Sequence, residues 1–198
     1  MKKLKFLPLL FVVLLAFSTQ AMATLSSKSE IENDANDALR TFYSEVKGSK
    51  KYLEHAKAYL VFPDVKEAGF FFGGRYGEGV LRVGNSSKAY YSITSASVGF
   101  QMGAQMHHMV IVFTSDAALN KFLLDDDEWE TDVDGKITIA EWNSKEELDD
   151  TDFEDDMVAF IFDAKGMLGS FTMDGTRFKR INALSPSLNI LLKLLCAC

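Results

Sequence analysis

The glycine-punctuated stretch from Ala68 to Ile93 constrains the fold more than any other part of this chain. Its sequence, AGFFFGGRYGEGVLRVGNSSKAYYSI, alternates short aromatic or β-branched runs with glycines. That pattern is typical of consecutive antiparallel strands joined by tight turns. The glycines do not match a phosphate-binding loop, because no G-x-G-x-x-G opens a helix here and no Gly-Lys-Ser/Thr follows. We therefore predict neighbouring strands of one sheet.

The sixteen residues from Tyr90 to Gln105, YYSITSASVGFQMGAQ, carry no charge and alternate as a strand does. A helix with a small-x-x-x-small ladder is the alternative, but each glycine weakens a helix interior by about 1 kcal/mol. We predict one long strand with an apolar face in the core. Its other face seats a neighbouring element or lines an enclosed interior, and we favour the packing role. The apolar face comprises Ala96, Val98, Phe100, Met102, Ala104 and Met106, and the other comprises Ser95, Ser97, Gly99, Gln101, Gly103 and Gln105.

A first helix is expected before the sheet. Ser27 with Glu30, or Ser29 with Glu32, has the spacing of a capping box. The apolar residues that follow recur at the helical period until Gly48, where the helix is expected to end. These residues are Ile31, Ala35, Ala38, Leu39, Phe42 and Val46.

A second, basic amphipathic helix is expected from Ser49 to about Leu60, before Pro63 stops it. The inward positions are Leu53, Ala56 and Leu60, and the outward lysines are Lys47, Lys50, Lys51 and Lys57. A helix of this kind either lies on an anionic bilayer or is an ordinary core helix with a solvated face.

The first 23 residues have the features of a Sec-type signal peptide. Three lysines precede an apolar run from Phe6 to Phe17, and Ala21-Met22-Ala23 follows. The apolar run is shorter than the roughly 20 residues of a membrane span. We predict cleavage between Ala23 and Thr24 and export, most simply to a bacterial periplasm, with peripheral membrane association.

One domain, residues 24–182, and an apolar C-terminal tail, residues 183–198, are expected after cleavage. The tail ends in Cys196 and Cys198. In an oxidising compartment this pair would close a small strained ring or link to another chain.

Acidic residues are concentrated between Asp125 and Asp156, where sixteen acids stand against two lysines. A solvated acidic loop is the simplest interpretation, and a surface that binds cations or a basic partner is the alternative. Within the segment, residues 130–141 resemble a twelve-residue calcium loop with Glu130, Asp132, Asp134 and Glu141 as ligands.

A β-hairpin fits residues 129–139 better than a calcium loop, because no helical apolar stripe follows Glu141 and no second loop exists to pair with this one. We expect a loop of Val133, Asp134 and Gly135, with Gly135 in the left-handed conformation. One face of the hairpin would then carry Trp129, Thr131, Ile137 and Ile139, and the other Glu130, Asp132, Lys136 and Thr138.

Catalysis and a cofactor are not expected. The imidazoles are those of His55, His107 and His108, and no G-x-S-x-G motif is present. His107 and His108 would point to opposite faces of a strand, which disfavours chelation of one metal by both. We therefore expect a structural role for them.

Several dispersed motifs resemble the SYLF domain family of lipid-binding proteins. They are KAYLVFPDVKEAGFFFGGRYGEGVL, YYSITSASVGFQMGAQ, VFTSDAALNKFL and MVAFIFDAKGMLGSFTMDGTRFKRI, in this order, and the resemblance covers roughly Ala35 to Asn182. It implies an α+β fold with a mainly antiparallel, twisted or barrel-like sheet and N-terminal amphipathic helices packed on it. Eukaryotic members bind phosphoinositides and regulate actin, and bacterial members are commonly exported. An exported bacterial protein meets no actin, so only lipid binding is expected here.

The expected function is that of a non-catalytic periplasmic lipid-binding module for anionic phospholipid or phosphoinositide-like headgroups. No nucleic-acid partner is expected, and protein partners are left open. The alternative is a structural or interaction protein whose acidic segment, residues 125–156, binds calcium or a basic partner. Candidate lipid-binding residues are Lys50, Lys51, Lys57, Arg75, Arg82, Lys165, Arg177, Lys179 and Arg180.

Overall fold

The computed structural model describes residues 26–69, 72–98, 103–124, 128–140, 148, 155–166 and 172–182. The predicted signal peptide, the C-terminal tail and Glu141 lie outside these residues, so the predictions made for them stay predictions.

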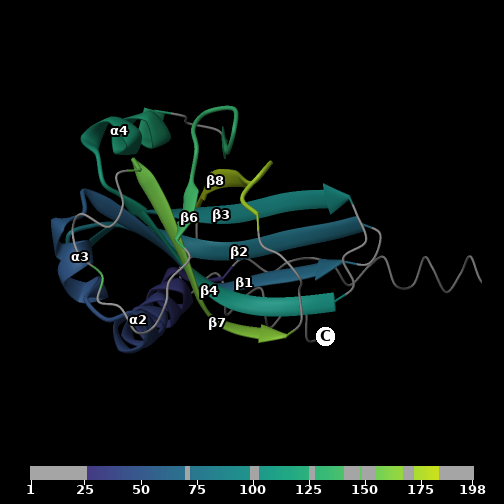
Figure 1. The fold of residues 1–198 in the computed structure, drawn as a ribbon, viewed down its shortest axis with the longest axis horizontal. Coiled ribbons are helices and arrows are strands. Elements are labelled where there is room, and N and C mark those ends of the chain that lie inside the picture. Colours follow the sequence, from purple (N-terminus) through teal and green to yellow (C-terminus); the bar gives the residue numbers. More distant parts are fainter. Residues whose placement is uncertain are drawn as a thin grey trace, which may run out of the picture.

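A curled, mostly antiparallel sheet organises the described residues, and helices flank it (Figure 1). The strand order is β5-β8-β3-β2-β1-β4-β7-β6, and only the β6–β7 pair among these is parallel. The expected α+β fold with a barrel-like sheet and an N-terminal helix packed on it is confirmed. The helices are α2 (Lys28–Glu45), α3 (Ser49–His55) and α4 (Asp116–Leu124). The strands are β1 (Ala58–Gly69), β2 (Phe72–Val83), β3 (Ser86–Val98), β4 (Gly103–Phe113), β5 (Trp129–Glu130), β6 (Thr138–Ala140), β7 (Met157–Gly166) and β8 (Arg177–Ile181).

Helix α2 covers the outer face of the sheet and forms the first of two cores. Its N-cap is Ser27, whose hydroxyl accepts a hydrogen bond from the Glu30 backbone while the Glu30 carboxylate accepts one from the Ser27 backbone. The first of the two predicted capping boxes is therefore the real one. Phe42 lies at the centre of this core, with ring centroids 5.3 Å from Phe160 and 5.1 Å from Phe162.

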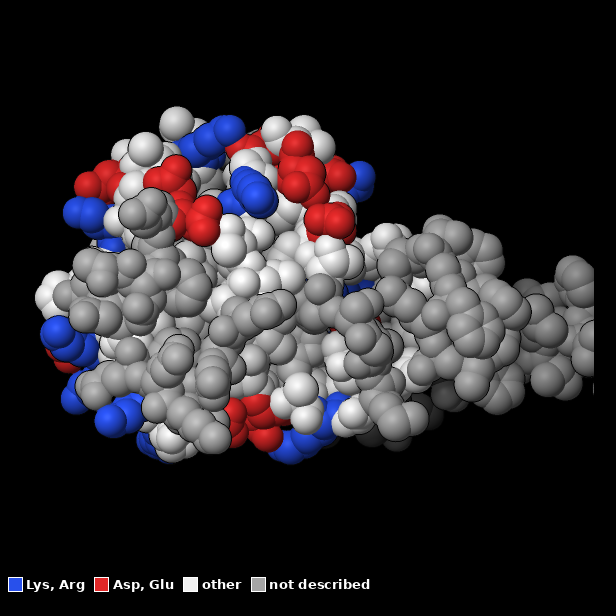
Figure 2. Space-filling view, in the orientation of Figure 1, with Lys and Arg blue, Asp and Glu red and all other residues white. Residues whose placement is uncertain are grey.

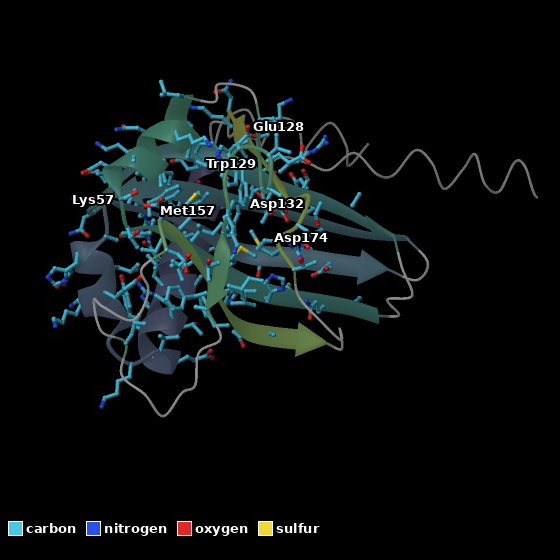
Figure 3. All side chains as sticks on the ribbon, turned by 45° about the horizontal axis from the view of Figure 1, so that its top comes forward. Lys57, Glu128, Trp129, Asp132, Met157 and Asp174 are labelled. Atoms are coloured by element: carbon cyan, nitrogen blue, oxygen red, sulfur yellow. The ribbon has the colours of Figure 1, made fainter. Side chains whose placement is uncertain are left out.

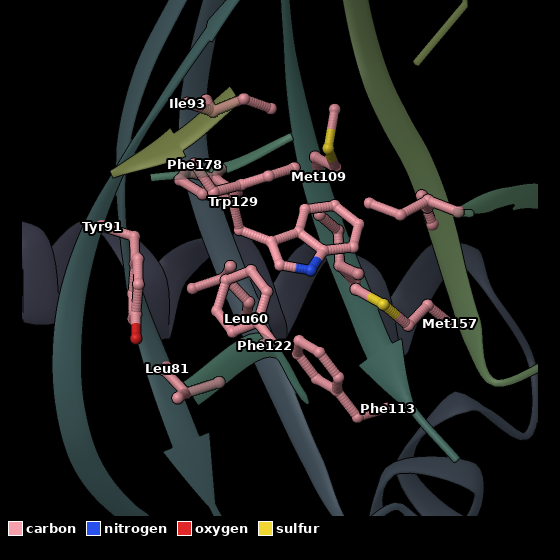
Figure 4. Packing of buried hydrophobic residues seen from close by; sticks show 14 of the residues in the cluster. Leu60, Leu81, Tyr91, Ile93, Met109, Phe113, Phe122, Trp129, Met157 and Phe178 are labelled. Atoms are coloured by element: carbon pink, nitrogen blue, oxygen red, sulfur yellow. The ribbon is translucent and has the colours of Figure 1, made fainter. Parts of the chain in front are cut away.

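The second core fills the inner face of the curled sheet. Phe122 of α4 and Trp129 of β5 meet there, with ring centroids 5.6 Å apart, and Phe178 of β8 lies 5.7 Å from Trp129 (Figure 4). All three side chains are buried. Helix α4 and the chain around Trp129 therefore cover the inner face of the sheet, as α2 covers the outer face.

The second predicted helix is shorter than expected. Helix α3 ends at His55, and the chain from Ala58 onward is strand β1, which contains Pro63. Residues Ala58–Phe62 are buried throughout, because β1 lies between β2 and β4 in the middle of the sheet. A continuous apolar run of this kind fits a strand buried on both faces as well as a helix, so periodicity alone misplaced the boundary. Pro63 sits where the register of β1 shifts against both neighbours.

The prediction of one long uncharged strand is wrong. Strand β3 ends at Val98 and β4 begins at Gly103, and β2 and β1 lie between these two strands in the sheet. Ala96 and Ala104, assigned to the core by their parity, are exposed. The cause is that a period of two can continue through the end of one strand into the next, so the pattern does not mark the boundary.

The predicted hairpin at residues 129–139 is also wrong in its pairing. Strand β5 pairs with β8 and β6 pairs with β7, so the two arms join opposite edges of the curled sheet. We call residues 128–140, which connect these edges, the covering segment. The left-handed residue of its turn is Asp132, with φ 70°, and not Gly135.

The inward and outward positions of the covering segment are as predicted at most sites. Trp129, Thr131 and Ile137 are buried, and Asp132 and Lys136 are exposed. Apolar side chains at alternate positions are needed to fill the inner face, whichever strands the two arms pair with. The alternation of buried and exposed residues was therefore predicted correctly although the pairing of the strands was not.

Substitution of Gly79 tests the close contact between β2 and β1. A Cβ atom at Gly79 would lie against the Val61 carbonyl oxygen and 2.5 Å from Cδ1 of Phe62. Gly79→Ala should therefore lower the free energy of unfolding by about 1–3 kcal/mol, as overpacking does. Chemical denaturation measures this loss.

Gly74→Ala, on the same strand, is the matched control. The nearest atom to a Cβ there is the Ser95 carbonyl oxygen at 3.8 Å. Its stability should stay within about 0.5 kcal/mol of the wild type. Equal losses in the two variants would contradict the steric explanation.

Candidate functional site

The nine predicted cations do not gather on one surface. Arg75 and Arg82 are buried in ion pairs, Arg75 with Glu67 at 3.3 Å and Arg82 with Glu32 at 2.7 Å. Their assignment to a lipid-facing patch is corrected, because a buried guanidinium paired with a carboxylate is not available to a headgroup. Arg82 instead joins β2 to α2, and the Tyr90 hydroxyl donates to the same Glu32.

Four other predicted cations lie on two strands, β8 and β7. Arg177 of β8 pairs with Glu128 at 3.2 Å and with Glu130 at 3.0 Å. Lys179 and Arg180 of the same strand are exposed, and Phe178 is buried between Arg177 and Lys179. Lys165 of β7 is exposed and lies 2.8 Å from Asp163.

The remaining candidates come together around α3. Lys50 and Lys51 point outward from the helix, while Tyr52 and Leu53 are buried beneath it. Lys47 and Lys57 flank the helix and are also exposed, and Lys57 lies 3.3 Å from Asp116. We call these four residues the α3 lysine surface. In Figure 2 basic side chains gather on the left, where Figure 1 places α3 and the end of α2.

A groove of about 400 Å³ adjoins the α3 lysine surface. It lies between α2, α3 and the turn that joins β2 to β3, and Lys50 contributes to its lining. Burial raises the pKa of the Tyr43 phenol, so this hydroxyl in the groove stays protonated at neutral pH and can donate a hydrogen bond. Sequence reasoning missed Tyr43, because nothing in the helical pattern distinguishes it from a solvated tyrosine. The lining comprises Tyr43, Lys50, Leu53, Glu54, Tyr59, Gly84 and Asn85.

A polar network occupies one end of the inner face. Glu67 and Arg75 are paired across β1 and β2, and Gln105 of β4 donates to Glu67 at 3.1 Å. Arg75 also donates to the Thr172 carbonyl oxygen at 3.0 Å and to the Thr176 hydroxyl at 3.3 Å. The network therefore ties the sheet to the turn before β8.

His107 is buried next to this network. Burial, together with the nearby positive charge of Arg75 and of His108, lowers the pKa of His107 from its usual 6.5 to about 4. His108 lies on the outer face, 3.3 Å from Asp163. The two histidines thus point to opposite faces, as predicted.

The candidate calcium ligands are in part engaged within the protein. Asp134 accepts a hydrogen bond from the Glu130 backbone at 2.7 Å, and the Glu130 carboxylate pairs with Arg177. Among the described residues, no group of three or more metal-binding side chains occurs. Figure 3 labels Glu128 and Asp132 in the covering segment and Asp174 in the turn before β8. Since Glu141 lies outside the described residues, calcium binding stays a prediction.

A second, larger groove of about 680 Å³ lies on the outer face of the sheet. Its lining includes Lys66, Ala68 and Gly74, together with Tyr76 and Met106. Sequence reasoning did not identify it, because small residues from β1, β2 and β4 become neighbours only when these strands pair. We call it the outer groove.

A curled sheet covered on both faces, with exposed lysines beside a groove, defines a small α+β binding domain. A family model described as "Ysc84: Las17-binding protein actin regulator" matches residues 94–184. These residues are similar to the Ysc84 family, whose domain is the SYLF domain, and the resemblance stated from the motifs is confirmed. The family is linked to actin and lipid binding and is not an enzyme family. Among curated proteins, none matches this chain.

Of the helices within the described residues, none is both long and apolar enough to cross a bilayer.

The low pKa of His107 predicts a loss of stability in acid. The unfolded chain binds a proton at His107 below about pH 6.5, whereas the folded chain resists it until about pH 4. The contribution to the unfolding free energy is therefore present above pH 6.5 and should fall by about 2 kcal/mol between pH 7 and pH 5. Urea denaturation of the wild type and of His107→Gln measures it, since the variant should lose this part of the pH dependence. His55→Gln, at an exposed histidine, is the control and should keep it.

A double-mutant cycle tests the Arg75–Glu67 pair. Arg75→Met leaves the Glu67 carboxylate buried without its cation and should cost about 3–5 kcal/mol. Glu67→Gln in the Arg75→Met background removes that charge and keeps an acceptor for Gln105, so the double variant should be more stable than Arg75→Met alone. Thermal and urea unfolding measure both. Simple additivity of the two losses would show that the pair is not coupled.

Proposed function

We propose that this protein binds the surface of membranes that contain anionic phospholipid, through the α3 lysine surface. The observation that carries the proposal is the arrangement of α3, with Lys50 and Lys51 outward over buried Tyr52 and Leu53. The family's link to lipid binding supports the same conclusion. Its link to actin is not part of the proposal.

The charge around α3 favours an anionic partner. Between Lys47 and Lys57 the chain carries four lysines and one glutamate. Each lysine near an anionic bilayer contributes about 1 kcal/mol, and salt screens that attraction. Lys50 and Lys51 form no ion pair with any other residue that the structure describes, so their charges are available to headgroups.

The groove beside Lys50 supplies a place for a headgroup. Its polar groups include the Lys50 ammonium and the Tyr43 hydroxyl, both hydrogen-bond donors that suit a phosphate oxygen. Buried Leu53 and Tyr59 form part of its lining. We further propose that binding takes place in an exported compartment, after removal of residues 1–23.

Replacement of Lys50 and Lys51 by glutamine tests the proposal. The double variant should lose about 2 kcal/mol of binding, roughly a 30-fold weaker affinity, for vesicles of phosphatidylcholine with phosphatidylglycerol. Co-sedimentation measures the affinity, and the wild-type affinity should fall as salt is raised.

Lys121→Gln with Lys136→Gln is the matched control, because it removes the same charge from exposed lysines of α4 and the covering segment. Its affinity should stay close to that of the wild type. Equal binding of the wild type to vesicles with and without phosphatidylglycerol, or equal loss in the two double variants, would overturn the proposal.

A further inference from the structure

The outer groove is a surface separate from the α3 lysine surface, and it continues the outer face of the sheet beyond α2. Helix α2 begins where the Ser26 backbone donates to the Glu78 carboxylate, and the Tyr76 hydroxyl donates to the same carboxylate at 2.6 Å. Tyr76 also lines the groove, which therefore opens directly beside the start of the helix. Its volume of about 680 Å³ lies within the range of roughly 300–1,000 Å³ of small-molecule sites.

The groove owes its shape to a step between two rows of residues. In one row Lys66 pairs with Tyr76 on β2 and with Met106 on β4. In the next row Ala68 pairs with Gly74 and with Ala104 on the same two strands. Large side chains in the first row thus stand beside very small ones in the second, and the lining is mostly apolar.

The charge at the rim is small and positive. The Lys165 ammonium lies 2.8 Å from the Asp163 carboxylate, so its charge is balanced. Lys66 is exposed and forms no ion pair with another described residue. The Glu67 carboxylate belongs to the buried pair with Arg75.

We propose that the outer groove binds one long-chain fatty acid. The acyl chain lies on the floor of Ala68, Gly74 and Ala104, against the wall formed by Tyr76 and Met106, and the carboxylate meets the Lys66 ammonium. One groove of this size and one unbalanced cation match a ligand with a single chain and a single negative charge. A diacyl phospholipid has a second chain for which this groove has no place.

Titration with cis-parinaric acid, a fluorescent fatty acid, tests the site in the full-length protein. Saturable binding of one molecule per chain is expected, and palmitate should displace the probe. Within a series of shorter saturated acids, affinity should rise with chain length, by up to about fourfold for each buried methylene. A failure to saturate at one site, or an affinity that does not depend on chain length, would overturn the proposal.

Gly74→Phe is designed to fill the groove. A Cβ atom at Gly74 would have its nearest neighbour at 3.8 Å, and an aromatic residue suits a strand better than glycine. Probe affinity should fall at least tenfold in this variant. Ala117→Phe adds the same ring at an exposed position on α4 and should leave the affinity unchanged. Unchanged binding in Gly74→Phe would assign the probe to another place and refute the site.

Lys66→Gln tests the carboxylate contact. It should weaken competition by palmitate several-fold and leave competition by hexadecanol, which has no charge, unaltered. An equal effect on the acid and the alcohol would remove Lys66 from the site.

The two binding surfaces are distinguished by crossing the assays. Gly74→Phe should keep vesicle binding, and the Lys50→Gln/Lys51→Gln variant should keep probe binding. If the wild-type protein binds the probe but not anionic vesicles, only the proposal for the α3 lysine surface fails. If it binds anionic vesicles but not the probe, only the proposal for the outer groove fails. A Gly74→Phe variant that loses both would show that the groove is not an independent site.

Discussion

The inner face of the curled sheet has to be filled with apolar side chains, and the rest of the fold depends on how this is done. Trp129 and Phe122 supply the filling from outside the long strands, and they pack on Phe178 and on Phe62 beyond it. Because Trp129 must reach this core, the covering segment is drawn across the sheet and joins its two edges through β5 and β6. Acidic residues such as Asp132 are left on its outer side.

Some of the cations stabilise the fold through ion pairs, and others stay exposed on the surface. Arg75 holds the turn before β8 against β1 and β2, and Arg82 holds α2 on the sheet. Arg177 is paired with Glu130 of β5 and with Glu128, which precedes that strand. The cations left for an anionic partner are chiefly lysines, which keep their flexible ammonium groups in water. This division explains why α3, and not Arg75, Arg82 or Arg177, carries the proposed membrane contact.

Much of the fold was predictable from local pattern. The capping box at Ser27, the apolar stripe of α2 and the alternation of Trp129 and Ile137 all act over a few residues, and the structure has each of them. Boundaries and partners were not predictable. The end of α3, the break between β3 and β4, and the pairing of β5 with β8 depend on which strand lies next to which. A period of two or of 3.6 does not contain that information.

The sequence by itself carried the motifs of the family resemblance, and that resemblance implied the class of fold. The sequence also determined the basic outer face of α3, because this follows from the spacing of lysines along the chain. Only the tertiary structure decided which charged residues meet. Glu67 and Arg75 are eight residues apart and become partners through the register of β1 and β2, and Glu32 reaches Arg82 only after α2 packs on the sheet. The outer groove arises in the same way, since Ala68, Gly74 and Ala104 form one floor only when three strands are paired.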